Sequence, residues 1–143
     1  MSLWAIVVGG SFVIGGLVHG AIYVFGIERT ARFASTGNSW ASSLQSIVFV
    51  PFVETLLLCI WVELLRLGSS SKLFIAVTAG VIAGLLHSIA SPTWGFTAAW
   101  GFFVFASAYL AWRPSSLPIA FTAALVPHAL NNATGLALIF FLD

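Results

Sequence analysis

Long apolar runs, separated by short polar stretches, make up almost the whole chain. Five of them approach or reach the 18–25 residues of a bilayer-spanning helix. They cover about residues 3–27, 43–67, 72–90, 94–112 and 117–142. A backbone inside lipid must satisfy its own hydrogen bonds, and helices do this within a single segment. The pattern therefore predicts an all-α, polytopic membrane protein with about five transmembrane helices in one bundle.

The polar stretches have the composition of loops and turns. The first, about residues 28–42, contains Arg29, Arg32 and a turn at Gly37-Asn38, and the later ones are shorter and rich in glycine, serine and proline. Such residues favour turns because they adopt or fix the backbone angles that a turn needs. No linker or low-complexity tail separates a second domain, so residues 1–143 are predicted to form a single transmembrane helical domain.

Composition points to lipid as the solvent. The chain is 60% hydrophobic and 6% charged, whereas soluble domains carry about 25% charged residues. A net charge of +1 is too small to suggest a nucleic-acid partner. The first run is longer than a signal-peptide core and lacks a basic flank, so we expect it to be retained as a helix. The prediction is a multi-pass protein of the cell (inner) membrane.

The polar side chains inside the apolar runs include four candidates for a functional site: Glu54, His87, His128 and Asn132. An ionisable side chain in a membrane is costly and is a functional-site hypothesis by default. Measured from the side of the turn at 68–72, the first three lie at depths of roughly 18, 21 and 17 Å, taking the helical rise of ~1.5 Å per residue. We therefore expect these side chains to converge near the bilayer midplane.

Their chemistry fits amide hydrolysis. His128 and Asn132 are four residues apart, so they share one helix face and can offer two hydrogen-bond donors to one oxyanion. Glu54 can take a proton from water, and His87 can share that water or stabilise the carboxylate. No serine, cysteine or aspartate is placed as an obvious nucleophile, so water is the expected attacker.

Other interpretations remain open for the same residues. An intramembrane glutamate or histidine can simply hold helices together, which is the preferred interpretation of His19. His87 and His128 can also be haem or metal ligands, but that interpretation gives Glu54 and Asn132 no role. No cofactor is therefore predicted. The single Cys59 excludes an internal disulfide and a cysteine-rich metal site.

Three motifs occur in order along the chain: Pro51-Phe-Val-Glu-Thr-Leu-Leu-Leu-Cys59, Ala83-Gly-Leu-Leu-His87 and His128-Ala-Leu-Asn-Asn132. Over about residues 45–135 they resemble the CAAX-protease and bacteriocin-processing (CPBP, or ABI) family of intramembrane proteases. That family shows Glu-Glu-x-x-x-Arg, Phe-x-x-x-His and His-x-x-x-Asn or Asp. The helix at 3–27 lies outside the resemblance. The departures are Thr55, Cys59 and Ala83, which replace the second glutamate, the arginine and the phenylalanine.

The resemblance implies a role for each of the four residues. In the family the first glutamate activates water, the first histidine assists it, and the last histidine and asparagine steady the oxyanion. By position these are Glu54, His87, His128 and Asn132. The implied function is a glutamate-dependent intramembrane endopeptidase that cuts a membrane-associated or prenylated peptide. The alternative is a catalytically inactive, CPBP-like small subunit that packs within a larger membrane complex, which the altered first motif favours.

Overall fold

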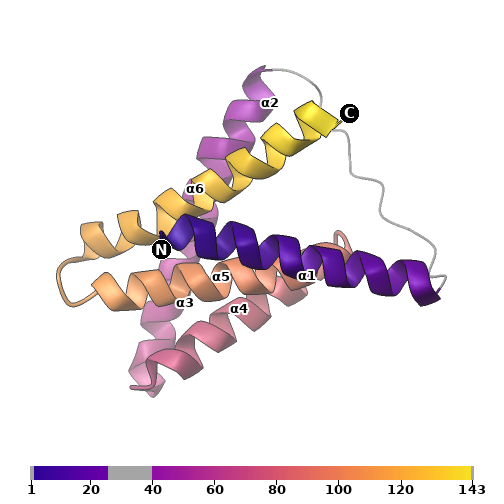
Figure 1. Cartoon of the computed structure of the whole chain (residues 1–143). Coiled ribbons are helices and arrows are strands. Elements are labelled where there is room, and N and C mark those ends of the chain that lie inside the picture. Colours follow the sequence, from indigo (N-terminus) through magenta and orange to yellow (C-terminus); the bar gives the residue numbers. More distant parts are fainter. Residues whose placement is uncertain (1, 26–39, 143) are drawn as a thin grey trace.

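A computed structural model describes residues 2–25 and 40–142, and these residues form helices joined by short turns, with no strand among them (Figure 1). The elements are α1 (Leu3–Phe25), α2 (Trp40–Leu44), the π-helix η1 (Gln45–Phe49), α3 (Val50–Gly68), α4 (Lys72–Ser88), α5 (Pro92–Trp112) and α6 (Leu117–Leu142). The all-α prediction is confirmed for this part of the chain. Arg29, Arg32 and the Gly37-Asn38 turn lie outside the described residues.

Residues 40–68 form one continuous helix with a π-helical turn inside it. Leu44 and Val50, which flank η1, both keep right-handed helical backbone angles, and the N–H of Val50 donates to the carbonyl of Gln45 five residues earlier. The next bond of this pattern would run from residue 51 to the carbonyl of Ser46. Residue 51 is proline and has no N–H. The π turn therefore leaves the Ser46 carbonyl without its helical partner.

Helix α5 lies at the centre and packs against α1, α3, α4 and α6 (Figure 1). Its contact with α4 is close because small residues face each other. A Cβ on Gly80 would lie 2.6 Å from the carbonyl oxygen of Ala99, and one on Gly84 would lie 2.7 Å from the Ala99 Cβ. Small residues allow two helix backbones to approach in this way.

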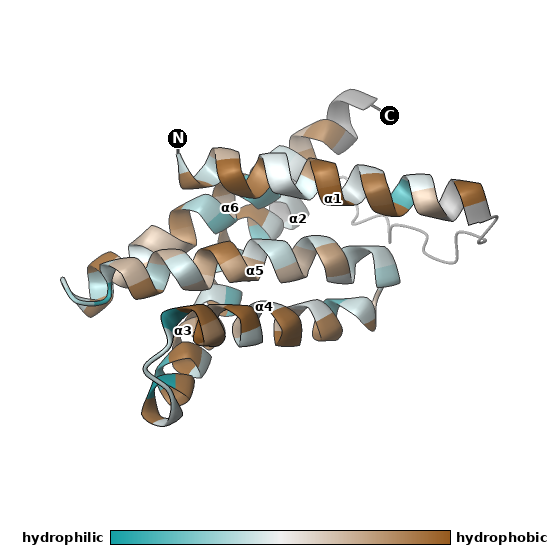
Figure 2. Cartoon of the chain, turned by 60° about the horizontal axis from the view of Figure 1, so that its bottom comes forward, coloured by the Kyte–Doolittle hydropathy of each residue, from teal (hydrophilic) through white to brown (hydrophobic). Residues whose placement is uncertain are grey.

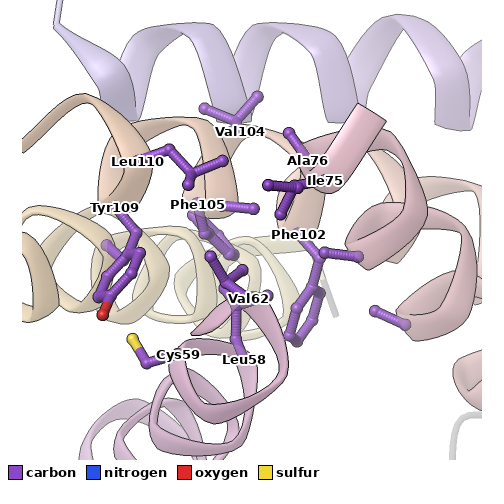
Figure 3. Close-up of a cluster of buried hydrophobic side chains, with 14 of the residues drawn as sticks. Leu58, Cys59, Val62, Ile75, Ala76, Phe102, Val104, Phe105, Tyr109 and Leu110 are labelled. Atoms are coloured by element: carbon purple, nitrogen blue, oxygen red, sulfur yellow. The ribbon is translucent and has the colours of Figure 1, made fainter. Parts of the chain in front are cut away.

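The buried core joins α3, α4 and α5, and Figure 3 shows its side chains meeting between these helices. On α3 the buried positions follow a helical stripe: Pro51, Thr55, Leu58, Cys59 and Val62. The neighbouring Leu57, by contrast, is 60% exposed. Both faces of α3 are thus apolar, and only one faces the core.

Within residues 2–25 and 40–142, three segments are long and apolar enough to cross a membrane: Leu3–Ala21, Ser42–Gly68 and Pro92–Trp112. Helix α4 is apolar but has only 17 residues, and α6 is interrupted by the polar His128, Asn131 and Asn132. Figure 2 shows that hydrophobic residues recur along the length of the helices. Many of these large apolar side chains are exposed, including Leu67 and Leu85, as expected for a surface that does not face water.

Candidate functional site

The carboxylate of Glu54 lies between two imidazoles, each from a different helix. Its Oε1 is 3.6 Å from Nε2 of His87 on α4, and its Oε2 is 3.2 Å from Nε2 of His128 on α6. The side chains of Glu54 and His87 are 29% and 30% exposed, whereas that of His128 is 3% exposed. Three helices therefore bring together three residues that the sequence places at similar depth, in a cluster that is open on the side of Glu54 and His87.

The ring of His128 is held tightly. It stacks on Phe105 with ring centroids 4.5 Å apart and an interplanar angle of 20°, and it makes a T-shaped contact with Phe102, with ring centroids 5.3 Å apart. Its Nδ1 lies 3.1 Å from the hydroxyl oxygen of Thr55, which is completely buried. With Nε2 facing Glu54, both nitrogens of this buried ring have a polar neighbour, as a buried polar group requires.

His87 is held by its own helix. Its Nδ1 donates to the carbonyl of Ala83 at 2.8 Å, and its ring lies 5.5 Å from that of Phe102. His87 is the last residue but one of α4, which ends at Ser88. The imidazole is therefore near a helix end, where the chain turns towards α5, and remains partly exposed.

Asn132 has a partner outside the Glu54 cluster. Its Nδ2 donates to the carbonyl oxygen of Ser46 at 3.1 Å, the carbonyl that the π turn and Pro51 leave without a helical N–H. The side chain of Asn132 thus completes the hydrogen bonding of a distorted helix on the facing α6. A carboxamide nitrogen has two N–H groups, so the bond to Ser46 uses one of them, and only the second can serve the predicted oxyanion site.

The sequence did not assign a role to Thr55, although it stands next to Glu54. Thr55 appeared only as a departure from the second family glutamate, and its contact with His128 spans 73 positions of sequence. The two other departures are buried as well: Cys59 belongs to the core, and Ala83 supplies the carbonyl that binds His87. His19 lies apart from this network on α1, where it is exposed and its Nδ1 donates to Gly15 at 2.9 Å.

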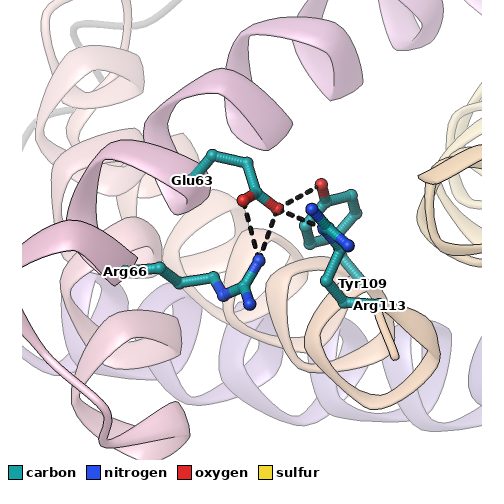
Figure 4. Close-up of polar contacts among 4 residues, drawn as sticks. All are labelled: Glu63, Arg66, Tyr109 and Arg113. Carbon is teal, nitrogen blue, oxygen red and sulfur yellow. Dashed lines mark hydrogen bonds and ion pairs between the residues drawn. The ribbon is translucent and has the colours of Figure 1, made fainter. Parts of the chain in front are cut away.

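A second polar cluster lies towards the end of α3, one turn beyond Cys59. The sequence predicts that Glu63 and Arg66, three residues apart, form a solvated pair; they do so at 2.7 Å and are more than one-third exposed. The hydroxyl of Tyr109 and the Nε of Arg113 also donate to Oε1 of Glu63, at 2.7 and 2.6 Å (Figure 4). The cluster therefore ties the end of α3 to the end of α5.

Within the described residues, no three His, Cys, Asp or Glu side chains are grouped to hold a metal ion. In the Glu54 cluster, the carboxylate of Glu54 lies between the Nε2 atoms of His87 and His128, where a metal ion bound by both imidazoles would lie. A cavity of about 340 Å³ lies between α1, α4 and α5, and its lining, which includes Ile14, Val81 and Phe103, is apolar.

Comparisons of the chain with models of protein families, with curated proteins and with solved structures find no match.

Proposed function

We propose that the chain is a multi-pass protein of the cell (inner) membrane in which all five helical segments cross or enter the bilayer. In the part of the chain that the structure describes, three segments have the length and hydropathy for this role. Short turns connect α3 to α4, α4 to α5 and α5 to α6. If one of these helices spans the bilayer, the helices joined to it by such turns must therefore also enter the bilayer. The exposed apolar side chains of α3 and α4 would contact lipid acyl chains.

We propose that this protein is a glutamate-dependent endopeptidase of the CPBP type, acting on a membrane-associated or prenylated peptide. The observation that carries the proposal is the Glu54 carboxylate between His87 and His128, with Glu54 and His87 partly exposed. A carboxylate between two imidazoles that the rest of the protein leaves partly uncovered is suited to general base catalysis where water reaches it. The order of the three motifs in the sequence supports the same assignment.

In the proposed reaction Glu54 removes a proton from water, and the resulting hydroxide attacks the carbonyl carbon of the scissile amide. The proton is then delivered to the amide nitrogen as the C–N bond breaks, so that a carboxylic acid and an amine are released. His87 lies beside Oε1 of Glu54 and would share the proton that Glu54 takes from water. His128 and the second N–H of Asn132 are the donors proposed for the oxyanion.

Glu54→Gln tests this mechanism because glutamine keeps the shape of the side chain and cannot act as the base. The purified protein would be incubated in detergent with a farnesylated peptide, and the products would be identified by mass spectrometry. We expect cleavage by the parent and none by Glu54→Gln. Glu63→Gln is the matched control on the same helix, since Glu63 lies outside the cluster, and we expect it to keep activity. Equal cleavage by the parent and Glu54→Gln would refute the mechanism.

The second candidate function is a small, inactive subunit of a larger membrane complex. It is favoured by the bond from Asn132 to Ser46, which gives this residue a structural role, and by the loss of the family's second glutamate and arginine at Thr55 and Cys59. Under this proposal the chain co-purifies with larger membrane proteins at fixed stoichiometry, and Glu54→Gln changes neither the assembly nor any activity of the complex.

A further inference from the structure

We propose that the two imidazoles beside Glu54 are held in opposite tautomers, and that Thr55 is the positioning residue that holds His128 in its tautomer. The neutral His87 carries its proton on Nδ1, whereas the neutral His128 carries its proton on Nε2. The assignment follows from which neighbours can only donate and which can only accept hydrogen bonds. It goes beyond the proposed reaction, because it describes the resting cluster.

His87 is fixed by its own helix. The partner of its Nδ1 is the carbonyl oxygen of Ala83 at 2.8 Å, and a carbonyl oxygen can only accept a hydrogen bond. The proton of the neutral ring must therefore be on Nδ1. Its Nε2 then presents a lone pair towards Oε1 of Glu54, at 3.6 Å, which is longer than a hydrogen bond. Two acceptors facing each other are expected to stay at such a distance.

His128 has the opposite arrangement. Its Nε2 lies 3.2 Å from Oε2 of Glu54, and an ionised carboxylate is an acceptor only, so a proton on Nε2 is favoured. Its Nδ1 must then accept a hydrogen bond, and the Thr55 hydroxyl at 3.1 Å can donate one. An ionised carboxylate at this position could not donate. Threonine is therefore chemically matched to this tautomer.

The consequence for the reaction rests on the proposed function. With the Nε2 of His128 already protonated and its Nδ1 bonded to Thr55, only His87 offers a bare ring nitrogen beside Glu54. A proton taken from water would thus be shared between Oε1 of Glu54 and Nε2 of His87, on the partly exposed side of the cluster. His128 would remain a hydrogen-bond donor, as an oxyanion contact requires.

Nitrogen NMR of the full chain tests the assignment without any measurement of activity. The protein has three histidines, so labelling with ¹⁵N-histidine gives three imidazole spin systems, which His19→Gln and His87→Gln variants assign. Spectra would be recorded in lipid bilayers at a pH well above the ordinary imidazole pKa of about 6.5. We expect His87 protonated at Nδ1 and His128 protonated at Nε2. Equal tautomers, or a doubly protonated ring at this pH, would overturn the proposal.

Thr55→Val and Thr55→Ser separate the hydroxyl from the shape of the side chain. In the parent, the Nδ1 resonance of His128 should be displaced from that of an unbonded nitrogen. Thr55→Val should remove this displacement and Thr55→Ser should keep it, whatever their effects on stability. If Thr55→Val does not fold, the comparison of Thr55→Ser with Thr55→Ala serves the same purpose. An Nδ1 resonance that is unchanged without the hydroxyl would show that Thr55 only fills space. If the protein shows these NMR resonances but cleaves no peptide, the proposed protease function is refuted and the tautomer assignment stands.

Discussion

Replacing Asn132 with alanine should lower the stability of the protein for a reason that lies on another helix. The change removes the donor at 3.1 Å from the Ser46 carbonyl, which has lost its helical partner to Pro51. An intramolecular hydrogen bond contributes about 0.5–1.5 kcal/mol net, and leaving a buried acceptor unpaired costs ~1–3 kcal/mol. Since this contact is only partly buried, we expect a loss of about 1 kcal/mol in the free energy of unfolding.

The role of Pro51 makes this prediction specific. Pro51→Ala supplies a backbone N–H that can bond to the Ser46 carbonyl from within the helix. In the Pro51→Ala background, the loss of unfolding free energy caused by Asn132→Ala should therefore be as small as the loss caused by Asn131→Ala, the control at the adjacent asparagine. The coupling between the two sites is then on the order of 1 kcal/mol, within the range of residues that share a partner.

The assay is reversible unfolding in mixed micelles, followed by helical circular dichroism for the parent, both single variants and the double variant. A double-mutant cycle cancels whatever Pro51→Ala costs by itself, such as the volume lost at a buried position. The reasoning is refuted if Asn132→Ala costs the same with and without Pro51. It is also refuted if Asn131→Ala is as destabilising as Asn132→Ala in the parent.

Two further predictions test the helix packing and the lipid contact. Gly80→Ala should lower the free energy of unfolding by about 1–3 kcal/mol, as overpacking does, because the added Cβ would lie 2.6 Å from an α5 carbonyl oxygen. Gly9→Ala is the control and should not destabilise the protein, since a Cβ at Gly9 has nothing within 4 Å. Equal melting temperatures of the two variants in detergent would contradict this explanation. In a Cys59→Ala background, Leu57→Cys should not react with a water-soluble maleimide in intact membranes, although the protein leaves Leu57 60% exposed. Ser70→Cys, in the turn after α3, should react. Rapid labelling of both cysteines would place α3 in water.

Patterns of apolar and polar residues were enough to predict the helices and the depth of the polar groups along them. Apolar runs bounded by glycine, serine and proline predicted the helical segments, and α5, predicted at 94–112, is observed at Pro92–Trp112. The rise per residue placed Glu54, His87 and His128 at similar depth, and their side chains do lie together. Local geometry is enough to predict the helices and the depths because these depend only on distance along one helix, whereas the contact between the three side chains also requires the helices to turn the right faces towards one another.

Which face of each helix is buried, by contrast, depends on how the helices pack in the folded protein. In a chain this apolar, hydrophobic periodicity cannot separate a core face from a lipid face, since both are lined by similar side chains. Leu57 and Leu58 are identical in the sequence, but Leu58 is 5% exposed and Leu57 is 60% exposed. The direction in which Thr55 points was hidden for the same reason.

The partners of the polar residues were also decided by the fold. Thr55 bonds to His128 and Asn132 to Ser46, across 73 and 86 positions of sequence. Glu63 gains Tyr109 and Arg113 from α5 in the same way. The sequence predicts the pairing of Glu63 with Arg66 because residues at positions i and i+3 share a helix face. The other contacts depend on how helices are rotated against one another, which the packing of the whole bundle determines.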